Sequence, residues 1–236
     1  MKFLDMFIED CKYYDHKNKE LKIILKYIDL KGKTILDIGS GIGRLSFPLS
    51  NHAKKVVALD KDKRFLEYFK RKRRKNLVFI NQNAEKYLKG GEKFDIILLA
   101  WPTINFKFIK LIKNVMHKGS SFIFITCDNN SDYETIIDKL GIVKKSYFEK
   151  DIKNKIRFIK ELPKKFKLII KKKFSTEYLY PDKKVAFRII KNGLMLWFNI
   201  KLDKNAEEKL KKVIDKHKIS KKVKFKEKIW FYILKK

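Results

Sequence analysis

The sequence contains few of the residues that build disulfide frameworks or metal sites. Its 236 residues include only two cysteines, Cys11 and Cys127, which stand far apart and lack the spacing of zinc ligands. No apolar run is long enough to span a bilayer, and the start of the chain has no long apolar stretch. These absences argue against a disulfide scaffold, a metal site and a membrane protein. We therefore expect a soluble, cytoplasmic protein.

Arginine is also scarce, although the chain is strongly basic. The formal net charge is +32 at pH 7, yet only seven of the 59 basic residues are arginine. A high positive charge favours polyanionic partners such as RNA, because cations that meet phosphates release counterions. Lysine enrichment is also a habit of heat-adapted organisms, and nucleic-acid recognition prefers the planar guanidinium group. The sequence leaves open whether the charge is functional or only compositional.

Hydrophobic residues make up 44% of the chain, which is enough for one well-buried core. Short apolar runs that are typical of buried strands open at Thr34 and occur at residues 55–60, 77–80, 94–100 and 121–127. Plausible helices or turns lie between these runs. Alternating strands and helices build a parallel sheet through right-handed crossovers, and such a sheet binds ligands at the carboxyl ends of its strands. The pattern predicts a Rossmann-like α/β fold.

Three segments are expected along the chain: an N-terminal helical segment (1–32), a core (33–149) and a C-terminal segment (150–236). The C-terminal segment should open with a helix at residues 150–162 that Pro163 closes. Period-two alternation then predicts a long strand from residue 166 to 180. Two helices, near residues 182–198 and 206–214, should precede a last strand at residues 229–234. The C-terminal segment would thus complete the sheet, with a helical insert between its last two strands.

The glycine-rich stretch after the first expected strand is the most informative feature. Residues 34–43 read Thr-Ile-Leu-Asp-Ile-Gly-Ser-Gly-Ile-Gly, with alternating glycines at Gly39, Gly41 and Gly43. Glycine lets the main chain approach a ligand closely and adopt positive φ angles. A dinucleotide fingerprint, G-x-G-x-x-G, would place its third glycine at Arg44, so that pattern fails. A glycine turn in some other α/β protein stays an alternative.

This stretch resembles motif I of the class I S-adenosylmethionine-dependent methyltransferases, hydrophobic-hydrophobic-Asp-x-Gly-x-Gly-x-Gly. The resemblance implies a Rossmann-like sheet of seven mostly parallel strands, an antiparallel last strand and helices on both faces. It also implies that S-adenosyl-L-methionine binds to the core at residues 33–149 and that its methyl group is transferred to an acceptor. In this family, an insert between the last two strands often shapes the acceptor pocket.

The same resemblance assigns cofactor-binding residues. Asp37 orders the glycine loop and approaches the methionine end of the cofactor. Asp60 ends the second strand, 21 residues after Gly39, where its carboxylate accepts hydrogen bonds from both ribose hydroxyls, or instead caps the next helix. The expected set is Asp37, Gly39, Ser40, Gly41, Gly43, Asp60, Lys61, Asn83, Ala84 and Ala100.

Two further positions follow from the family arrangement. Asn83, with the backbone at Ala84, is expected against the exocyclic amine of adenine, where aspartate is usual, or it serves as a helix N-cap. Trp101 follows Ala100 at the end of the fourth strand and either stabilises the sulfonium through its ring or packs in the core. The stretch after Ala100 lacks the Asp/Asn-Pro-Pro-aromatic pattern, which argues against methylation of exocyclic base nitrogens.

The acceptor is not identified by the sequence. Alignment alone can drive methyl transfer, so no base is required. If a base acts, the candidates are Tyr13, Tyr14 and His16, although a packing or surface role is favoured for each. A small molecule is slightly favoured over RNA. The basic run at residues 70–75 is either a solvated helix end or an RNA clamp. The competing hypothesis is a non-catalytic protein that senses the cofactor or binds RNA.

Overall fold

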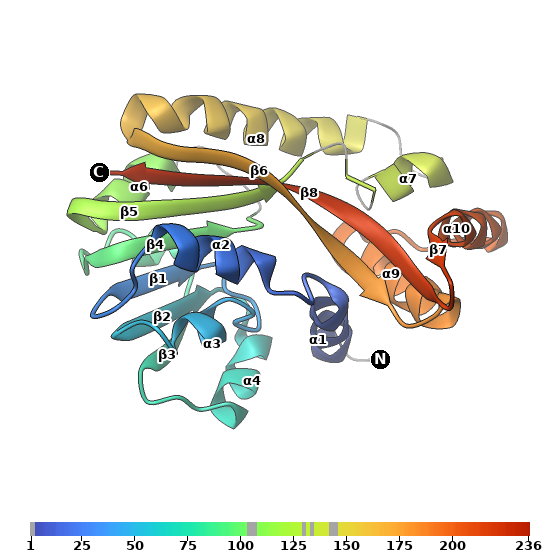
Figure 1. Cartoon of the computed structure of the whole chain (residues 1–236), viewed down its shortest axis with the longest axis horizontal. Coiled ribbons are helices and arrows are strands. Elements are labelled where there is room, and N and C mark those ends of the chain that lie inside the picture. Colours follow the sequence, from blue (N-terminus) through green and yellow to red (C-terminus); the bar gives the residue numbers. More distant parts are fainter. Residues whose placement is uncertain (1–2, 103–107, 129–130, 133–134, 142–145) are drawn as a thin grey trace. The chain divides into compact units, whose positions relative to one another are not determined.

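The computed structural model describes residues 3–102, 108–128, 131–132, 135–141 and 146–236. Within them, eight strands form one sheet in the order β3-β2-β1-β4-β5-β8-β6, with β7 paired to β8 (Figure 1). The strands are β1 (Thr34–Ile38), β2 (Lys55–Asp60), β3 (Leu77–Asn81), β4 (Phe94–Ala100), β5 (Met116–Cys127), β6 (Lys167–Tyr180), β7 (Lys218–Ile219) and β8 (Lys222–Lys235). The predicted α/β fold is confirmed, and the two-residue β7 is one strand more than expected.

Strands β1 to β5 are parallel. β1 pairs with β2 and β4, β2 with β3, and β4 with β5. β8 runs opposite to β5 and β6 in Figure 1 and is antiparallel to β7. Because parallel strands are joined by crossovers, the carboxyl ends of β1, β2, β3 and β4 meet at one edge of the sheet. The predicted cofactor residues follow these four strand ends.

The helices occupy the connections. They are α1 (Phe3–Tyr13), α2 (Lys19–Tyr27), α3 (Ser46–Leu49), α4 (Leu66–Arg71), α5 (Ala84–Tyr87), α6 (Phe108–Asn114), α7 (Thr135–Leu140), α8 (Ser146–Lys165), α9 (Lys183–Phe198) and α10 (Lys204–Lys216). A 3-10 turn, η1 (Lys63–Phe65), precedes α4. None of the described helices combines the length and apolarity needed to cross a membrane.

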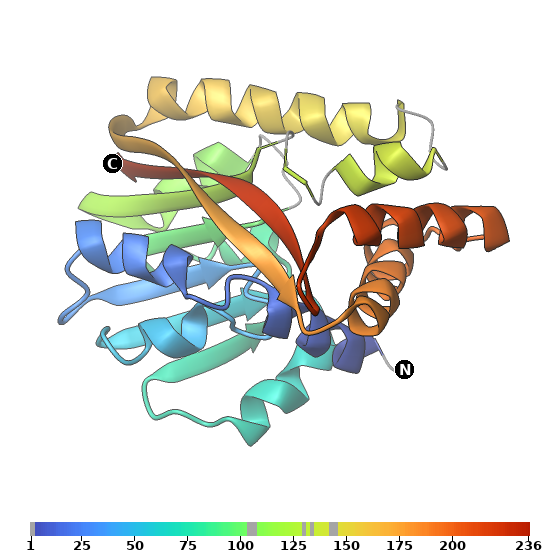
Figure 2. The same ribbon diagram turned by 45° about the vertical axis from the view of Figure 1, so that its right-hand side comes forward.

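Spatial contacts divide the chain into two units. Unit 1 comprises Met1–Lys19, Cys127–Phe148 and Ser175–Ile229, and unit 2 comprises Glu20–Thr126, Glu149–Phe174 and Trp230–Lys236. Each unit has its own buried cluster. In unit 1, α9 and α10 pack with the unit's parts of β6 and β8, as Figure 2 shows. The two units interleave along the chain because β6 and β8 contribute residues to both.

The core of unit 2 follows the period-two geometry of its strands. In β1, Leu36 and Ile38 belong to the buried cluster that includes Ile112 of α6 and Phe158 of α8. Alternate residues of a strand point to opposite faces, so Asp37 points to the other face, on which α3 lies. The sheet thus carries a fully apolar cluster on one face and a buried carboxyl group on the other.

The C-terminal segment corrects the sequence-based expectation at two places. Helix α8 begins at Ser146 and continues past Pro163 to Lys165, because a proline in the last turn deprives only one carbonyl of its helical partner. Strand β8 begins at Lys222 rather than at residue 229. Its first half alternates exposed lysines with buried residues, and one of the buried residues is Glu227, which hides the apolar pattern of a strand.

Candidate functional site

The loop at residues 39–43 follows β1 at the carboxyl edge of the sheet. Gly39, Gly41 and Gly43 have φ angles of +73°, +55° and +75°. Any other L-residue would be strained in this left-handed region, which explains the alternating glycines. A Cβ atom added to Gly39 would meet no atom within 4 Å, and Gly39 is exposed. The backbone at Gly39 is therefore open to a ligand.

Gly43 has a different environment. A Cβ atom added here would lie 2.6 Å from Cζ of Phe69 and 2.9 Å from Cδ2 of Phe47. The two rings stack on each other with their centroids 5.0 Å apart. Gly43 is buried beneath this pair, so its missing side chain lets the aromatic rings of α3 and α4 approach the loop. A cofactor contact at Gly43 stays a prediction.

Asp60 connects the end of β2 to the glycine loop. Its Oδ2 accepts a hydrogen bond from the N–H of Gly41 at 2.9 Å, and its Oδ1 accepts one from the N–H of Asp62 at 2.9 Å. A carboxylate oxygen accepts up to two hydrogen bonds, so each oxygen keeps capacity for one ribose hydroxyl. Helix capping falls to Asp62, whose Oδ1 accepts from the N–H of Arg64 at 3.0 Å. Lys61, between the two aspartates, is exposed.

The remaining hydrogen-bonding capacity of the loop fits the cofactor that the resemblance implies. The N–H groups of Gly39 and Ser40 both donate to the carbonyl of Leu59, at 2.8 and 3.1 Å, and the N–H of Gly43 donates to the carbonyl of Ser40 at 2.8 Å. These donors are used within the fold. The buried Ser40 hydroxyl oxygen has no partner in the described part of the chain. Together with Asp60 it offers acceptors to a ligand whose sugar hydroxyls and amino groups are donors.

Asp37 is a buried carboxyl group beneath the loop. Its Oδ2 accepts a hydrogen bond from the hydroxyl of Ser46 at 2.5 Å, which ties β1 to the first residue of α3. Burial raises the pKa of Asp37 to about 6, and the nearby Asp60 adds to the rise. The Ser46 hydrogen bond and the positive charge of Arg44 act in the opposite direction. Asp37 therefore holds the segment that follows the glycine loop.

A second buried carboxylate, Glu20, was missed by the sequence analysis. Glu20 is 0% exposed at the start of α2. Its Oε2 accepts from Nη2 of Arg44 at 2.5 Å, and its Oε1 accepts from the indole N–H of Trp101 at 2.8 Å. Trp101 itself has φ +54°, and its N–H donates to the carbonyl of Ile125 at 3.0 Å. Glu20 thus links α2, the residue after the glycine loop and the end of β4.

The positions expected near adenine and the methyl group are placed as follows. The Oδ1 of Asn83 accepts from the N–H groups of Glu85 at 2.8 Å and Lys86 at 3.3 Å, so Asn83 is the N-cap of α5. Ala84 is the half-buried first residue of that helix. Ala100 is the half-buried last residue of β4. Because the amide oxygen of Asn83 caps the helix, its amide nitrogen is the group left to contact the adenine ring. The adenine contact stays a prediction.

The three candidate bases belong to unit 1, whereas the glycine loop belongs to unit 2. Tyr13 packs on Tyr180 with ring centroids 5.5 Å apart, and the buried Tyr14 packs on Tyr178 at 4.9 Å. His16 Nε2 lies 3.7 Å from Oε1 of Glu177. Each side chain therefore has a structural partner within unit 1. A catalytic role for Tyr13, Tyr14 or His16 stays a prediction.

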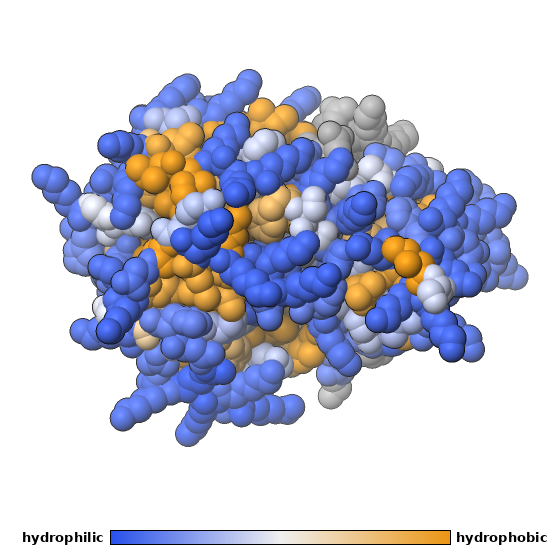
Figure 3. Space-filling view, viewed as in Figure 1, coloured by the Kyte–Doolittle hydropathy of each residue, from blue (hydrophilic) through white to orange (hydrophobic). Residues whose placement is uncertain are grey.

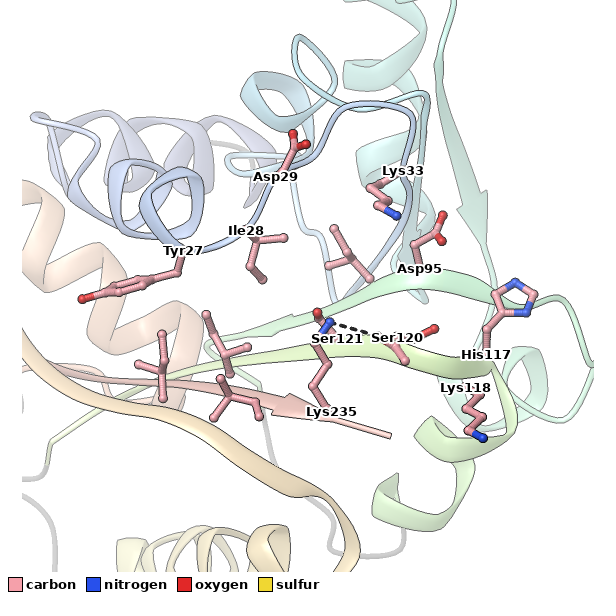
Figure 4. Close-up of a pocket in the computed structure, with 15 residues that line it drawn as sticks. Tyr27, Ile28, Asp29, Lys33, Asp95, His117, Lys118, Ser120, Ser121 and Lys235 are labelled. Carbon is pink, nitrogen blue, oxygen red and sulfur yellow. Dashed lines mark hydrogen bonds between the residues drawn. The ribbon is translucent and has the colours of Figure 1, made fainter.

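A cavity of about 350 Å³ lies elsewhere in unit 2 (Figure 4). Its lining includes Tyr27 at one end and His117 and Lys118 at the other. It also includes Asp95 and Ser121, which lie toward the starts of the paired segments of β4 and β5. The cavity is thus at the edge opposite the glycine loop and holds none of the predicted cofactor residues. Ligands of open α/β sheets bind at the carboxyl edge, so we do not assign the cofactor to this cavity.

The described residues hold no group of three or more histidine, cysteine, aspartate or glutamate side chains placed to bind a metal ion. Cys11 and Cys127 are both half-buried, and no disulfide joins them.

Comparison with protein families relates this chain to a known domain family. The family model described as a methyltransferase domain matches residues 29–160, which is more than half of the chain. The matched region contains the glycine loop, Asp60 and the carboxyl ends of β1 to β5.

Two groups of curated relatives are similar to this chain. One is the "Probable ribosomal RNA small subunit methyltransferase A" of Methanosphaera stadtmanae, which is 36% identical over 90 residues, covering 36% of this chain and 32% of the relative. The other is the ubiquinone biosynthesis O-methyltransferase of Coxiella burnetii, 32% identical over 117 residues, covering 47% of this chain and 50% of the relative. The chain spans between about a third and a half of these relatives' lengths.

Solved structures of similar fold cover nearly the whole chain. The YcgJ protein of Bacillus subtilis has a TM-score of 0.56 and 15% identity, covering 94% of this chain and 98% of that protein. The precorrin-6y C5,15-methyltransferase of Geobacter metallireducens has a TM-score of 0.52 and 9% identity, covering 91% and 86%. At these identities the likeness concerns the fold alone.

Proposed function

Because this chain belongs to the family of methyltransferase domains, we propose that it is an S-adenosylmethionine-dependent methyltransferase whose cofactor lies against the loop at residues 39–43. The observation that carries the proposal is the open backbone at Gly39 beside the Asp60 carboxylate. Both stand at the carboxyl edge of adjacent parallel strands, where open α/β sheets bind ligands. When bound, the cofactor supplies a methyl group attached to a sulfonium, an excellent leaving group.

The residues of the chain have separate tasks in this proposal. Asp60 accepts hydrogen bonds from the ribose, and Gly39 leaves room for the ligand against the main chain. Trp101 at the end of β4 is held by Glu20, and we assign its ring to the positively charged sulfonium end of the cofactor. Transfer is an in-line displacement in which alignment alone supplies about 7–11 kcal/mol, so a dedicated base is not required.

The relatives offer two kinds of molecule as the methyl acceptor. The relatives' names give two acceptor classes, ribosomal RNA and an oxygen atom in ubiquinone biosynthesis. A methyl acceptor of some kind is part of the proposal, and RNA is one candidate. A protein that binds the cofactor without transferring its methyl group is the competing possibility.

The first test measures cofactor affinity by calorimetry. A charge-assisted hydrogen bond contributes about 1.5–3 kcal/mol, so Asp60→Ala should weaken S-adenosylmethionine binding by about tenfold to a hundredfold. The matched control is Asp95→Ala, because Asp95 is also a strand-end aspartate of unit 2 but stands at the opposite edge, where it accepts from Thr34. Equal affinities of the Asp60 variant and the wild-type protein would refute the site.

Turnover separates an enzyme from a sensor. The wild-type protein is incubated with cell extract and methyl-labelled S-adenosylmethionine, and label is counted in the RNA, protein and small-molecule fractions. We expect label in one fraction with the wild-type protein and the Asp95 variant, and much less with the Asp60 variant. Tight cofactor binding without any transferred label would instead support the sensor.

A further inference from the structure

The segment between β2 and β3 carries the densest positive charge of unit 2. Residues 61–75 contain nine lysine or arginine residues but only two acids, Asp62 and Glu67. Four of the chain's seven arginines fall within it, at Arg64, Arg71, Arg73 and Arg74. Elsewhere the chain is basic almost only through lysine, so this clustering of arginine is not explained by composition.

Both acids of the segment are already paired. The side chain of Arg64 donates three hydrogen bonds to Asp62: Nη2 to Oδ2 at 2.5 Å, Nε to Oδ1 at 2.8 Å and Nε to Oδ2 at 2.9 Å. Glu67 binds Nζ of Lys70 at 2.8 Å. The next five side chains are all exposed, and none has an ion pair among the described residues; we call them the cationic strip: Arg71, Lys72, Arg73, Arg74 and Lys75.

Part of the cationic strip is held in place by groups that do not neutralise it. Nζ of Lys72 lies 4.6 Å from the ring centroid of Tyr68 and 5.9 Å from that of Phe47. Cζ of Arg74 lies 5.9 Å from the same Phe47 ring, and its Nη1 donates to Oδ1 of Asn51. Aromatic rings and an amide orient cations but leave their charge available. The strip is therefore ordered and uncompensated, which favours a polyanionic ligand.

The cationic strip is connected to the glycine loop through one aromatic stack. Phe47 lies beneath Lys72 and Arg74, stacks on Phe69 and covers Gly43. Figure 3 shows hydrophilic side chains projecting from the lower edge of the molecule, where Figure 1 places α4 and the chain that leads to β3. A methyl acceptor that reaches the proposed cofactor site and also contacts the strip would be an extended ligand, which favours a polymer.

We propose that the cationic strip binds the phosphate backbone of an RNA strand that serves as the methyl acceptor. The acceptor assignment rests on the proposed methyltransferase function, whereas the binding does not. Phosphates spaced along a strand match consecutive cations, and their binding releases counterions from the strand. If residues 70–75 were only a solvated helix end, they would give no affinity for RNA.

The test measures binding of a fluorescein-labelled single-stranded RNA of mixed sequence by fluorescence anisotropy, without S-adenosylmethionine. The strip variant is Arg71→Gln, Arg73→Gln and Lys75→Gln. The control variant is Lys204→Gln, Lys212→Gln and Lys216→Gln, which removes the same charge from exposed positions of α10. We expect the strip variant to bind RNA about tenfold to a hundredfold more weakly and the control to change it less than about threefold.

The salt dependence gives a second readout. Each lost phosphate contact lowers the slope of log affinity against log salt by about 0.7 for a single strand, so the strip variant should have a slope smaller by about 2. Equal weakening by both variants would mean that only net charge matters and would overturn the proposal. A DNA strand of the same sequence that binds more tightly than the RNA would overturn the assignment to RNA.

Calorimetry with S-adenosylmethionine separates this proposal from the proposed function. The strip variant should keep wild-type affinity for the cofactor but transfer less labelled methyl to RNA. Wild-type protein that binds RNA through the strip yet fails to bind the cofactor would refute the methyltransferase and leave the RNA surface standing. Wild-type rates of RNA labelling by the strip variant would refute the RNA surface and leave the cofactor site standing.

Discussion

In the glycine loop, the absence of a side chain has different consequences at Gly39 and at Gly43. Gly39 and Gly43 have nearly the same φ, +73° and +75°, so the backbone makes the same demand at both. The surroundings differ, because Gly39 faces open space whereas Gly43 lies against Phe47 and Phe69. Gly39 leaves space for a ligand, whereas Gly43 leaves space for two packed aromatic side chains.

This difference predicts opposite phenotypes for two alanine substitutions. Gly43→Ala should lower the free energy of unfolding by about 3 kcal/mol, because backbone strain adds to overpacking against two rings. Gly39→Ala should cost only about 1 kcal/mol of stability but strongly weaken S-adenosylmethionine binding. Urea unfolding and calorimetry measure the two effects. Two variants with the same stability and the same affinity would contradict these assignments.

Among the elements, α2 is fixed to the site by one side chain. Glu20 accepts from both Arg44 and Trp101 and is wholly buried, while the side chain of Arg44 is 23% exposed. Breaking a buried ion pair leaves an uncompensated charge, which costs more than the pair itself contributes. The link between α2 and the end of β4 therefore depends on the carboxylate of Glu20.

Substitution of Glu20 tests the link. Glu20→Ala should lower the free energy of unfolding by about 3 kcal/mol, since Arg44 and the indole N–H both lose their acceptor. Glu20→Gln should cost less, because the amide oxygen can still accept one bond. The control is Glu67→Ala, which breaks an exposed pair with Lys70 and should change stability little. Similar losses in the Glu20 and Glu67 alanine variants would argue against a buried anchor.

At the scale of the whole molecule, buried acids set how stability depends on pH. Asp10 lies in α1 of unit 1, where burial raises its pKa to about 7, and its Oδ1 has no partner in the described part of the chain. Burial also raises the pKa of Asp37, which lies in unit 2. Both carboxyl groups bind protons more tightly in the folded state than an ordinary aspartate with a pKa of 3.8 does. Each therefore reduces stability as the pH rises toward its folded pKa.

The variant Asp10→Asn removes one of these titrations and lies outside the unit that holds the glycine loop. Its free energy of unfolding relative to the wild-type protein should rise steadily between about pH 4 and about pH 7 and then level off. The gain across this window should be about 4 kcal/mol. Urea unfolding at a series of pH values measures the difference. Parallel pH profiles of the two proteins would show that Asp10 is not the titrating group.

The sequence predicted the elements of the parallel sheet well because local patterns encode them. Residues 55–60 and 94–100 were expected as strands and form β2 and β4 with the same bounds. The predicted last strand was shorter than β8, because exposed lysines and the buried Glu227 interrupt the apolar pattern of β8. Asn83 could be read as an adenine contact or a helix cap, and only the positions of the amide groups of Glu85 and Lys86 show that it caps.

By itself, the sequence determined the α/β class and the place of the glycine loop at a strand end, because both follow from short-range periodicity and from main-chain conformations that only glycine adopts easily. Tertiary structure alone decided that Glu20 meets Trp101 and that Gly43 lies under two rings. It also decided that the cations of residues 71–75 have no carboxylate partner within the part of the chain that the structure describes. Such contacts join residues far apart in the chain. They depend on how helices pack on the sheet, which no local pattern records.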